Sequence, residues 1–393
     1  MKYRSTMNAC FTGYIVQAIV NNFVPLLFVT FQNSWHIPLS RITMLITVNF
    51  IIQLSVDLAS AGFVDRLGYR ASAVTAHLFS AAGLLMLTFL PDMMPDPFYG
   101  ILISVIVYAV GGGLIEVLIS PIIESCPTDN KETAMSLLHS FYCWGYMGVV
   151  LFSTVFFALF GTGNWRALTL VWAVIPVVNA VVFCKVPLFS LDENEETGMS
   201  ISSLISDRKF LMLMLMLMML SAGAGEQSVS QWASTFAEEG LGLSKTVGDL
   251  AGPMMFALMM GLSRVLYSRY GDRIELDSAM KCSAAACVIS YVCIAIPSSV
   301  LGIVGCALCG FSVGILWPGT FSLASRSLVR GGTAMFALLA LAGDLGCTAG
   351  PTLAGMISSA AGDNLRLGVF AAVIFPVMFL IAAVFLGNRR KEK

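Results

Sequence analysis

Acidic side chains occur inside long apolar stretches of this chain. Asp57, Glu116, Glu226 and Asp344 each lie within a run of apolar residues. A carboxylate at the centre of a membrane helix costs about 2.5–3.5 kcal/mol on insertion scales, so such residues face a cavity or a partner and mark solute or ion pathways. Glu116 has no basic residue in its own stretch, and a desolvated carboxylate without a cation can bind and release a proton near neutral pH. The sequence therefore predicts proton coupling through Glu116, Glu226 and Asp344, although a structural hydrogen bond or a pair with Arg264 is the alternative.

Amide and aromatic side chains accompany these acids. Asn49, Gln53 and Asp57 recur every four residues and so share one helix face, and Gln227 and Gln231 repeat this spacing. Amides suit the hydroxyl groups of a sugar, and aromatic rings suit its C–H surface. The sequence predicts a sugar site formed by Asn21, Asn22, Gln53, Glu116, Tyr142, Trp144, Glu226, Gln227, Gln231, Trp232 and Trp317. The same stripes can instead join helices to one another, and His139 is either a proton relay or a packing residue.

The composition predicts an all-α membrane protein with twelve transmembrane helices. The chain is 57% hydrophobic and 11% charged, whereas soluble domains are about 25% charged. Because a span needs about 20 residues, twelve spans leave room only for short loops. We expect them at 9–31, 41–63, 72–90, 98–122, 133–160, 166–187, 210–236, 247–267, 278–296, 299–323, 333–358 and 365–387.

Other classes of protein are disfavoured by the same composition. The net charge is -1 and basic patches interleaved with aromatic residues are absent from the sequence, so we expect no nucleic-acid partner. The ten cysteines show no metal or redox spacing, and Cys306 and Cys309 lie inside an apolar run. No phosphate-binding loop, nucleophile–base pair or metal-ligand cluster is evident, so we expect no enzyme activity, no cofactor and no metal.

The two halves of the chain resemble each other. Three short motifs recur in the same order: Asp57-x3-Ala61-x3-Asp65-Arg66 as Arg264-x3-Ser268-x3-Asp272-Arg273, Leu39-Ser40-Arg41 as Leu243-Ser244-Lys245, and Thr133-Ala134-Met135 as Thr333-Ala334-Met335. Such parallel repeats are typical of secondary transporters, which build a substrate site at the repeat interface. We expect six-helix bundles at 1–187 and 210–393, joined by a cytoplasmic linker over 188–209.

The distribution of basic residues predicts the orientation. If the N-terminus is cytoplasmic, all but four of the 22 lysines and arginines fall on the cytoplasmic side, the exceptions being Arg41, Arg166, Lys245 and Arg366. The positive-inside rule therefore predicts that both termini are cytoplasmic. We expect the protein to lie in the plasma membrane.

The loop after the second predicted span resembles the signature of the major facilitator superfamily. Ala61-Gly62-Phe63-Val64-Asp65-Arg66-Leu67-Gly68-Tyr69-Arg70 matches its glycine followed by Asp-Arg-x-Gly-Arg-Arg, except that Ala61 replaces a glycine and Tyr69 a basic residue. The resemblance implies two six-helix bundles that alternate access by rocking. Charged residues at these helix ends can latch one conformation, and we expect this role for Asp57, Asp65, Arg66, Arg70, Arg264, Asp272 and Arg273.

Three further segments resemble the fucose permease branch of that superfamily. Its fourth span has a glycine run, a glutamate and a proline, as in Gly111–Gly113, Glu116 and Pro121. The segments 137–145 and 225–232 resemble its polar-aromatic fifth helix and the Glu…Trp pattern of its glucose-type relatives. The first-span aspartate of the permease is missing near Pro25, so its coupling scheme does not transfer whole.

These features predict a monomeric secondary transporter of a sugar or related polyhydroxylated solute, with proton symport as the mechanism. Sodium is left open as the coupling ion. A drug/proton antiporter of the same superfamily is the alternative, and a non-transporting receptor or scaffold leaves the buried acids unexplained.

Overall fold

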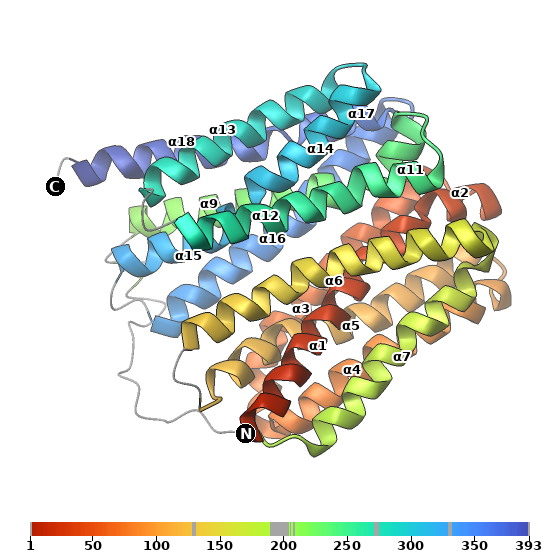
Figure 1. Cartoon of the computed structure of the whole chain (residues 1–393), viewed down its shortest axis with the longest axis horizontal. Helices are drawn as coiled ribbons and strands as arrows, with labels where there is room; N and C mark the ends of the chain where they lie inside the picture. Colours follow the sequence, from red (N-terminus) through yellow and green to blue (C-terminus); the bar gives the residue numbers. More distant parts are fainter. Residues whose placement is uncertain are drawn as a thin grey trace. The chain divides into compact units, whose positions relative to one another are not determined.

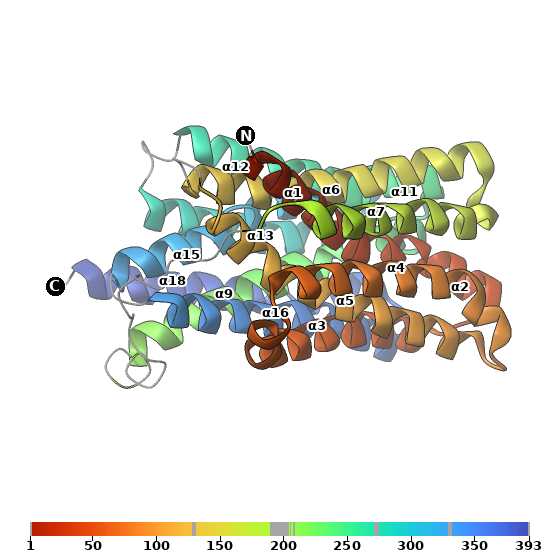
Figure 2. The same ribbon diagram turned by 90° about the horizontal axis from the view of Figure 1, so that it is seen from below.

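The structure, a computed structural model, describes residues 2–127, 131–188, 204, 206, 209–270, 275–328 and 332–391. Within these residues every regular element is a helix, which confirms the all-α fold. The chain divides into two compact units, Met1–Asn194 and Glu195–Lys393, and in each the long helices run side by side as a bundle (Figure 1, Figure 2). The predicted linker lies mostly outside the described residues, so its limits stay a prediction.

The helices of the first unit are α1 (Lys2–Asn22), η1 (Val24–Leu27), α2 (Phe28–Trp35), α3 (Leu39–Leu67), α4 (Tyr69–Met93), α5 (Pro97–Glu124), α6 (Lys131–Phe160), η2 (Thr162–Asn164) and α7 (Trp165–Lys185). Those of the second unit are α9 (Lys209–Ser230), α10 (Ala233–Thr235), η3 (Phe236–Gly240), α11 (Lys245–Asp249), η4 (Leu250–Met254), α12 (Met255–Tyr270), α13 (Leu276–Ala295), α14 (Ser299–Val313), α15 (Leu316–Ser327), α16 (Gly332–Ala360), α17 (Leu365–Ala371) and α18 (Ile374–Lys391).

Twelve helical segments in the described residues are long and apolar enough to cross a membrane, and each overlaps one predicted span. A helix satisfies its own backbone hydrogen bonds, which is required where no water is available. The twelve predicted spans are therefore confirmed.

The first span of each unit is interrupted directly after its amide residues. In the first unit α1 ends at Asn22, and Pro25 lies in the short η1 before α2. In the second unit α9 ends at Ser230, and Gln231 and Trp232 form a turn before α10 and the π-helical η3. Broken membrane helices commonly form the solute and ion sites of transporters. The breaks thus mark the same position in both repeats.

Two arginines at corresponding positions of the two units donate hydrogen bonds to carbonyl groups near the C-terminal ends of neighbouring helices. Arg166 donates to a carbonyl near the end of α4 at 3.1 Å, and its guanidinium lies 5.7 Å from the ring centroid of Trp35. Arg366 donates at 2.6 Å to a carbonyl just after α13, and lies 5.6 Å from the ring of Phe236. A cation at a helix C-terminus stabilises the last carbonyl groups. The paired arrangement supports the internal repeat independently of the short sequence motifs.

Asp96 is the N-cap residue of α5, and its contacts indicate that the stability of the protein depends on pH. Its carboxylate accepts from the Phe98 amide at 3.0 Å and from Arg41 at 2.6 Å, and these two contacts lower the pKa of Asp96 below its ordinary value. A lowered pKa contributes stability above the ordinary aspartate pKa, and that stability is lost as the pH falls through the lowered pKa. Asp96→Ala should therefore lower the melting temperature at neutral pH. The difference in melting temperature from the wild type should disappear at acidic pH. Asp96→Asn retains the capping oxygen and should have a smaller effect, and equal melting of all three proteins at neutral pH would contradict the assignment.

Candidate functional site

Three consecutive glycines on α5 bring three other helices close to the segment that precedes Glu116. A Cβ atom on Gly111 would lie 2.5 Å from a backbone oxygen of α4, and one on Gly113 would lie 2.9 Å from a backbone oxygen of α3. On Gly112 it would lie 3.0 Å from a side chain of α1. Glycine allows this close approach on three sides of α5. Glu116, one turn after Gly112, therefore lies where α1, α3 and α5 meet.

A hydrogen-bonded chain of amides begins at Glu116. Gln17 of α1 donates its Nε2 to Glu116 Oε2 at 3.1 Å and to Gln53 Oε1 at 3.0 Å. Gln53 of α3 donates to Asn21 Oδ1 at 2.8 Å, and Asn49 donates to the same oxygen at 3.4 Å. All four amides are buried. The chain thus links four buried amides, which can form hydrogen bonds with hydroxyl groups, to a carboxyl group.

Two oxygens of this chain of amides can accept further hydrogen bonds. Gln17 Oε1 and Asn49 Oδ1 are buried, and neither has a donor within the part of the protein that the structure describes. An unsatisfied buried acceptor costs about 1–3 kcal/mol, and such atoms in native proteins are few. Hydroxyl groups of a solute are suitable donors for both oxygens.

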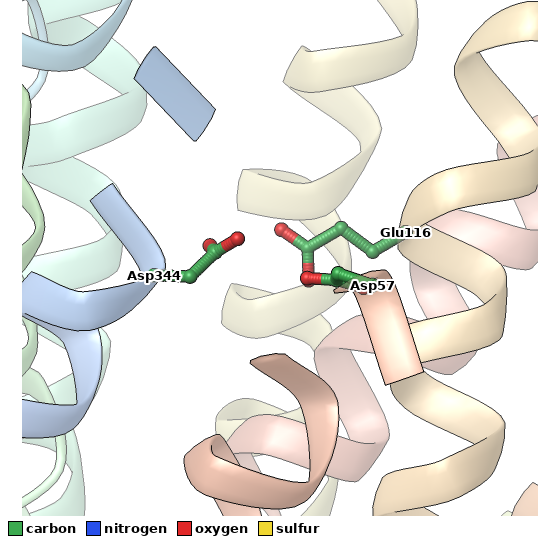
Figure 3. Close-up of side chains that lie close together, drawn as sticks. All are labelled: Asp57, Glu116 and Asp344. Carbon is green, nitrogen blue, oxygen red and sulfur yellow. The ribbon is translucent and has the colours of Figure 1, made fainter. Parts of the chain in front are cut away.

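Asp57 lies beside Glu116, as the close-up in Figure 3 shows. One carboxylate oxygen of each residue lies within 4.8 Å of the other, across α3 and α5. Like charges at this separation repel each other, so a proton or another cation stabilises the pair. The sequence predicts Asp57 to be a latch residue, whereas the structure places it beside Glu116, the acid that ends the chain of amides.

The remaining first-unit candidates lie on α6. Tyr142 accepts a hydrogen bond from Asn22 at 3.3 Å, and so connects the break after α1 to α6. The ring of His139 lies 5.6 Å from that of Tyr14. Trp144 is 51% exposed. Contacts with the solute through Tyr142, Trp144 and His139 stay predictions.

The second unit has a shorter polar chain along α9. Gln231 donates to Gln227 Oε1 at 3.1 Å, and Gln227 donates to Glu226 Oε1 at 3.4 Å. Arg264 of α12 acts electrostatically on Glu226 and donates to the carbonyl of Gly314, at the break between α14 and α15, at 3.1 Å. Arg264, which the sequence grouped with the latch, therefore lies near the acid of its own unit.

Two tryptophans predicted to bind the solute have packing roles in the second unit. Trp232 is fully buried and donates its indole N–H to the Pro351 carbonyl at 2.9 Å. This position does not support a stacking surface for a solute, because both faces of the ring are covered. Trp317 packs where a Cβ atom on Gly343 would overlap its ring. Asp344, also drawn in Figure 3, is half-buried on α16 directly after Gly343.

Most of the latch residues lie where the structure describes little. Asp65 and Arg66 are in the last turn of α3, but their side chains are outside the described residues, as are Asp272 and Arg273. Arg70 donates at 2.7 and 2.8 Å to two carbonyls at the C-terminal end of α7, in its own unit. One basic residue of the signature loop thus holds a helix terminus, and a conformational role for the others stays a prediction.

Sequence reasoning missed Gln17, which connects Glu116 to the other amides. The signal was available, because Gln17 and Asn21 are four residues apart on the first span, like Asn49 and Gln53 on the second. It also missed Asp249, an acid inside the eighth span that is fully buried.

Comparisons with known proteins agree with this architecture. The sequence matches the model of the Major Facilitator Superfamily over residues 10–351. Among solved structures, a D-xylose-proton symporter aligns with a TM-score of 0.77 at 14% identity, covering 98% of this chain and 97% of the other. A bacterial homologue of the human lysosomal transporter Spinster gives 0.74 at 15% identity, with 97% of both chains covered.

A third solved structure, the transporter FucP in the outward conformation, aligns with a TM-score of 0.66 at 15% identity, covering 98% and 99% of the two chains. No curated protein matches the sequence. At these identities the solved structures establish the fold alone, whereas the family match covers most of the chain. The protein is therefore an integral, multi-pass membrane transporter that belongs to the major facilitator superfamily.

Proposed function

We propose that the protein is a proton-coupled symporter of a sugar or a related polyhydroxylated solute, working by alternating access. The observation that carries the proposal is the continuous chain Asn21–Gln53–Gln17–Glu116 in the first unit. It places planar amides, which suit hydroxyl groups, in direct contact with a titratable acid. The D-xylose-proton symporter shares the fold, which is consistent with this solute class.

Coupling follows from the chemistry of Gln17. When Glu116 is ionised it accepts the Gln17 Nε2 hydrogen bond. A protonated Glu116 can donate instead, so that Gln17 turns its Oε1 toward the acid and its Nε2 toward Gln53 and the solute. The donors and acceptors offered to the solute then differ between the two protonation states. Proton binding and solute binding are linked in this way.

We assign the second unit a matching share of solute recognition through Glu226, Gln227 and Gln231. Glu226 and Gln227 precede the break after α9, as Asn21 and Asn22 precede the break after α1, and Gln231 lies in the break itself. Arg264 and Asp344 provide charges of opposite sign in the same unit. We also propose that the protein belongs to the fucose permease branch and is a monomer. Both termini then lie in the cytoplasm, and the protein lies in the plasma membrane.

Transport of a cationic solute in exchange for protons is the second candidate. The close pair of Asp57 and Glu116 favours it, because two adjacent carboxylates attract a cation. A sugar needs the amides more than the second acid, whereas a cationic drug needs both acids more than the amides. The two functions therefore predict different sensitivities to substitution.

Counterflow with reconstituted protein separates the candidates. Proteoliposomes are loaded with one unlabelled compound from a panel of sugars, polyols and lipophilic cations, and uptake of its labelled form is measured. We expect counterflow with a sugar or polyol, unaffected by replacing sodium with potassium. Counterflow with lipophilic cations alone would favour the antiporter, and exchange that requires sodium would identify sodium as a coupling ion.

Gln53→Ala tests the amide chain directly. The substitution removes the link between Gln17 and Asn21, and we expect solute affinity to fall by about 1–3 kcal/mol, as for other buried hydrogen bonds left unpaired. Ser55→Ala on the same helix is the control, since Ser55 is exposed and donates to a carbonyl of its own helix. Equal affinities of the two variants, measured from the concentration dependence of counterflow, would remove Gln53 from the site.

A further inference from the structure

A second cluster of charged residues lies where the seventh and eighth spans are joined. Lys245, the first residue of α11, donates its Nζ to Glu238 Oε1 at 2.8 Å, to Asp249 Oδ1 at 2.9 Å and to Ser234 Oγ at 3.0 Å. Ser234 donates to Asp249 Oδ1 at 2.5 Å. The three protons of the ammonium group are therefore all used.

The charges in this cluster do not balance. The side chain of Asp249 is completely buried, and those of Lys245 and Glu238 are 14% and 13% exposed. Among the described residues, Lys245 is the one cation that forms an ion pair with either acid. Burial raises the pKa of Glu238, and Lys245 opposes this rise. One ammonium ion thus faces two carboxylates, and a buried carboxylate without its own cation is costly.

One atom of the cluster shows where the missing positive charge belongs. Asp249 Oδ1 accepts two hydrogen bonds, whereas Asp249 Oδ2 is buried and accepts none from any described residue. An ionised carboxylate shares its charge between both oxygens, so it would leave half of that charge unsolvated. A neutral acid protonated on Oδ2 keeps the bonds to Oδ1 and removes the charge.

The neighbouring groups do not supply the missing charge. Burial raises the pKa of Glu239, and the negative charges of Glu238 and Asp363 raise it further. Arg366 directs its guanidinium to the carbonyl of Gly240 at 3.1 Å and over an aromatic ring. The acids therefore add negative potential, and the nearby arginine is engaged with backbone oxygens.

We propose that Asp249 is a second proton-binding site, in which Oδ2 carries the proton while Glu238 remains ionised and paired with Lys245. Glu116, the proposed coupling acid, belongs to the other unit. Glu238 lies in the π-helical η3, and Asp249 directly precedes the π-helical η4. Such π-helical turns are rare and occur often at functional sites. Loss of the proton would leave both acids competing for Lys245 and would shift the ends of the two spans.

Infrared difference spectroscopy of the full-length protein in lipid nanodiscs tests this assignment. The carbonyl stretch of a protonated carboxylic acid is measured as the pH is raised from acid to alkaline values. We expect the wild type to show, beside the bands of any other protonated acids, one band from Asp249 that Asp249→Asn removes. The asparagine side chain imitates the neutral acid and retains an oxygen for Lys245 and Ser234, so this variant should fold.

Three more variants complete the test. Glu238→Gln should also remove the band, because Asp249 then becomes the only acid for Lys245 and ionises. Glu239→Gln is the matched control, and Glu116→Gln separates this site from the proposed coupling acid; both should retain the Asp249 band. A band that is unchanged in Asp249→Asn, or that persists in Glu238→Gln, would overturn the proposal.

Discussion

Replacement of Glu116 by glutamine is expected to abolish accumulation driven by a pH gradient while exchange of solute across the membrane continues. Glutamine keeps the shape of the side chain and an oxygen that can accept the bond from Gln17, which is 3.1 Å long in the wild type. It cannot take up or release a proton. Coupling should therefore be lost, and the binding of solute largely kept.

Two assays on the same proteoliposomes measure this prediction. Uptake driven by an inwardly directed proton gradient should fall to the level of passive equilibration, whereas counterflow at equal pH should persist. Asp92→Asn is the control, because Asp92 is an exposed acid that pairs with Arg166 at 2.8 Å. Wild-type accumulation by Glu116→Gln would remove Glu116 from the coupling mechanism and leave Asp57 or the acids of the second unit as candidates.

Gly346→Ala should strongly destabilise the second unit. A Cβ atom at this position of α16 would overlap the Leu220 carbonyl of α9 and lie 2.9 Å from the Ala224 nitrogen. Backbone atoms cannot turn aside as a side chain can, so the two helices must separate. Overpacking of this kind costs about 1–3 kcal/mol, and occasionally more. Because α9 carries Glu226 and Gln227, the polar chain of this unit should be displaced as well.

Gly225→Ala on α9 is the matched control. A Cβ atom there would have its nearest neighbour, a side-chain atom of Pro376, at 3.8 Å, which is ordinary contact. Alanine in place of glycine favours a helix by roughly 0.5–1 kcal/mol, so this variant should melt at the wild-type temperature or above it. Thermal unfolding in detergent distinguishes the two glycines, and equal melting temperatures would mean that α9 and α16 do not cross as closely as described.

The fold could be predicted almost completely from the sequence, because membrane helices are specified locally by length and hydropathy. Apolar length predicted the twelve spans, and the paired motifs predicted the two units. The interruptions were harder to predict. Pro25 breaks the first span, since proline lacks an N–H, but the turn at Gln231 and Trp232 has no such local cause.

The candidate site was predicted only in part. Spacing placed Asn49, Gln53 and Asp57 on one face of α3, but it could not indicate which helix lies opposite. Contact between that face and Gln17 depends on how α1, α3 and α5 pack, which the glycine run at 111–113 determines through close approach of the backbones. For the same reason the sequence alone predicts Asp57 to be a latch residue, although it lies beside Glu116.

Trp232 is a residue for which the local sequence pattern suggests a binding role that its position in the structure does not support. An aromatic residue next to two glutamines suggests a sugar-stacking surface, but the same ring can fill the interior of a helix bundle. Its indole N–H bonds to a carbonyl of α16, a contact between residues far apart in the chain that no local pattern indicates.

Proton movement that accompanies the solute is the most direct test of the proposed symport. Lightly buffered proteoliposomes without a pH gradient are mixed with the sugar identified by counterflow, and the external pH is recorded. We expect the medium to become more alkaline as protons enter with the sugar, and Glu116→Gln to remove this response. Acidification of the medium, or solute entry without any pH change in the wild type, would contradict proton symport.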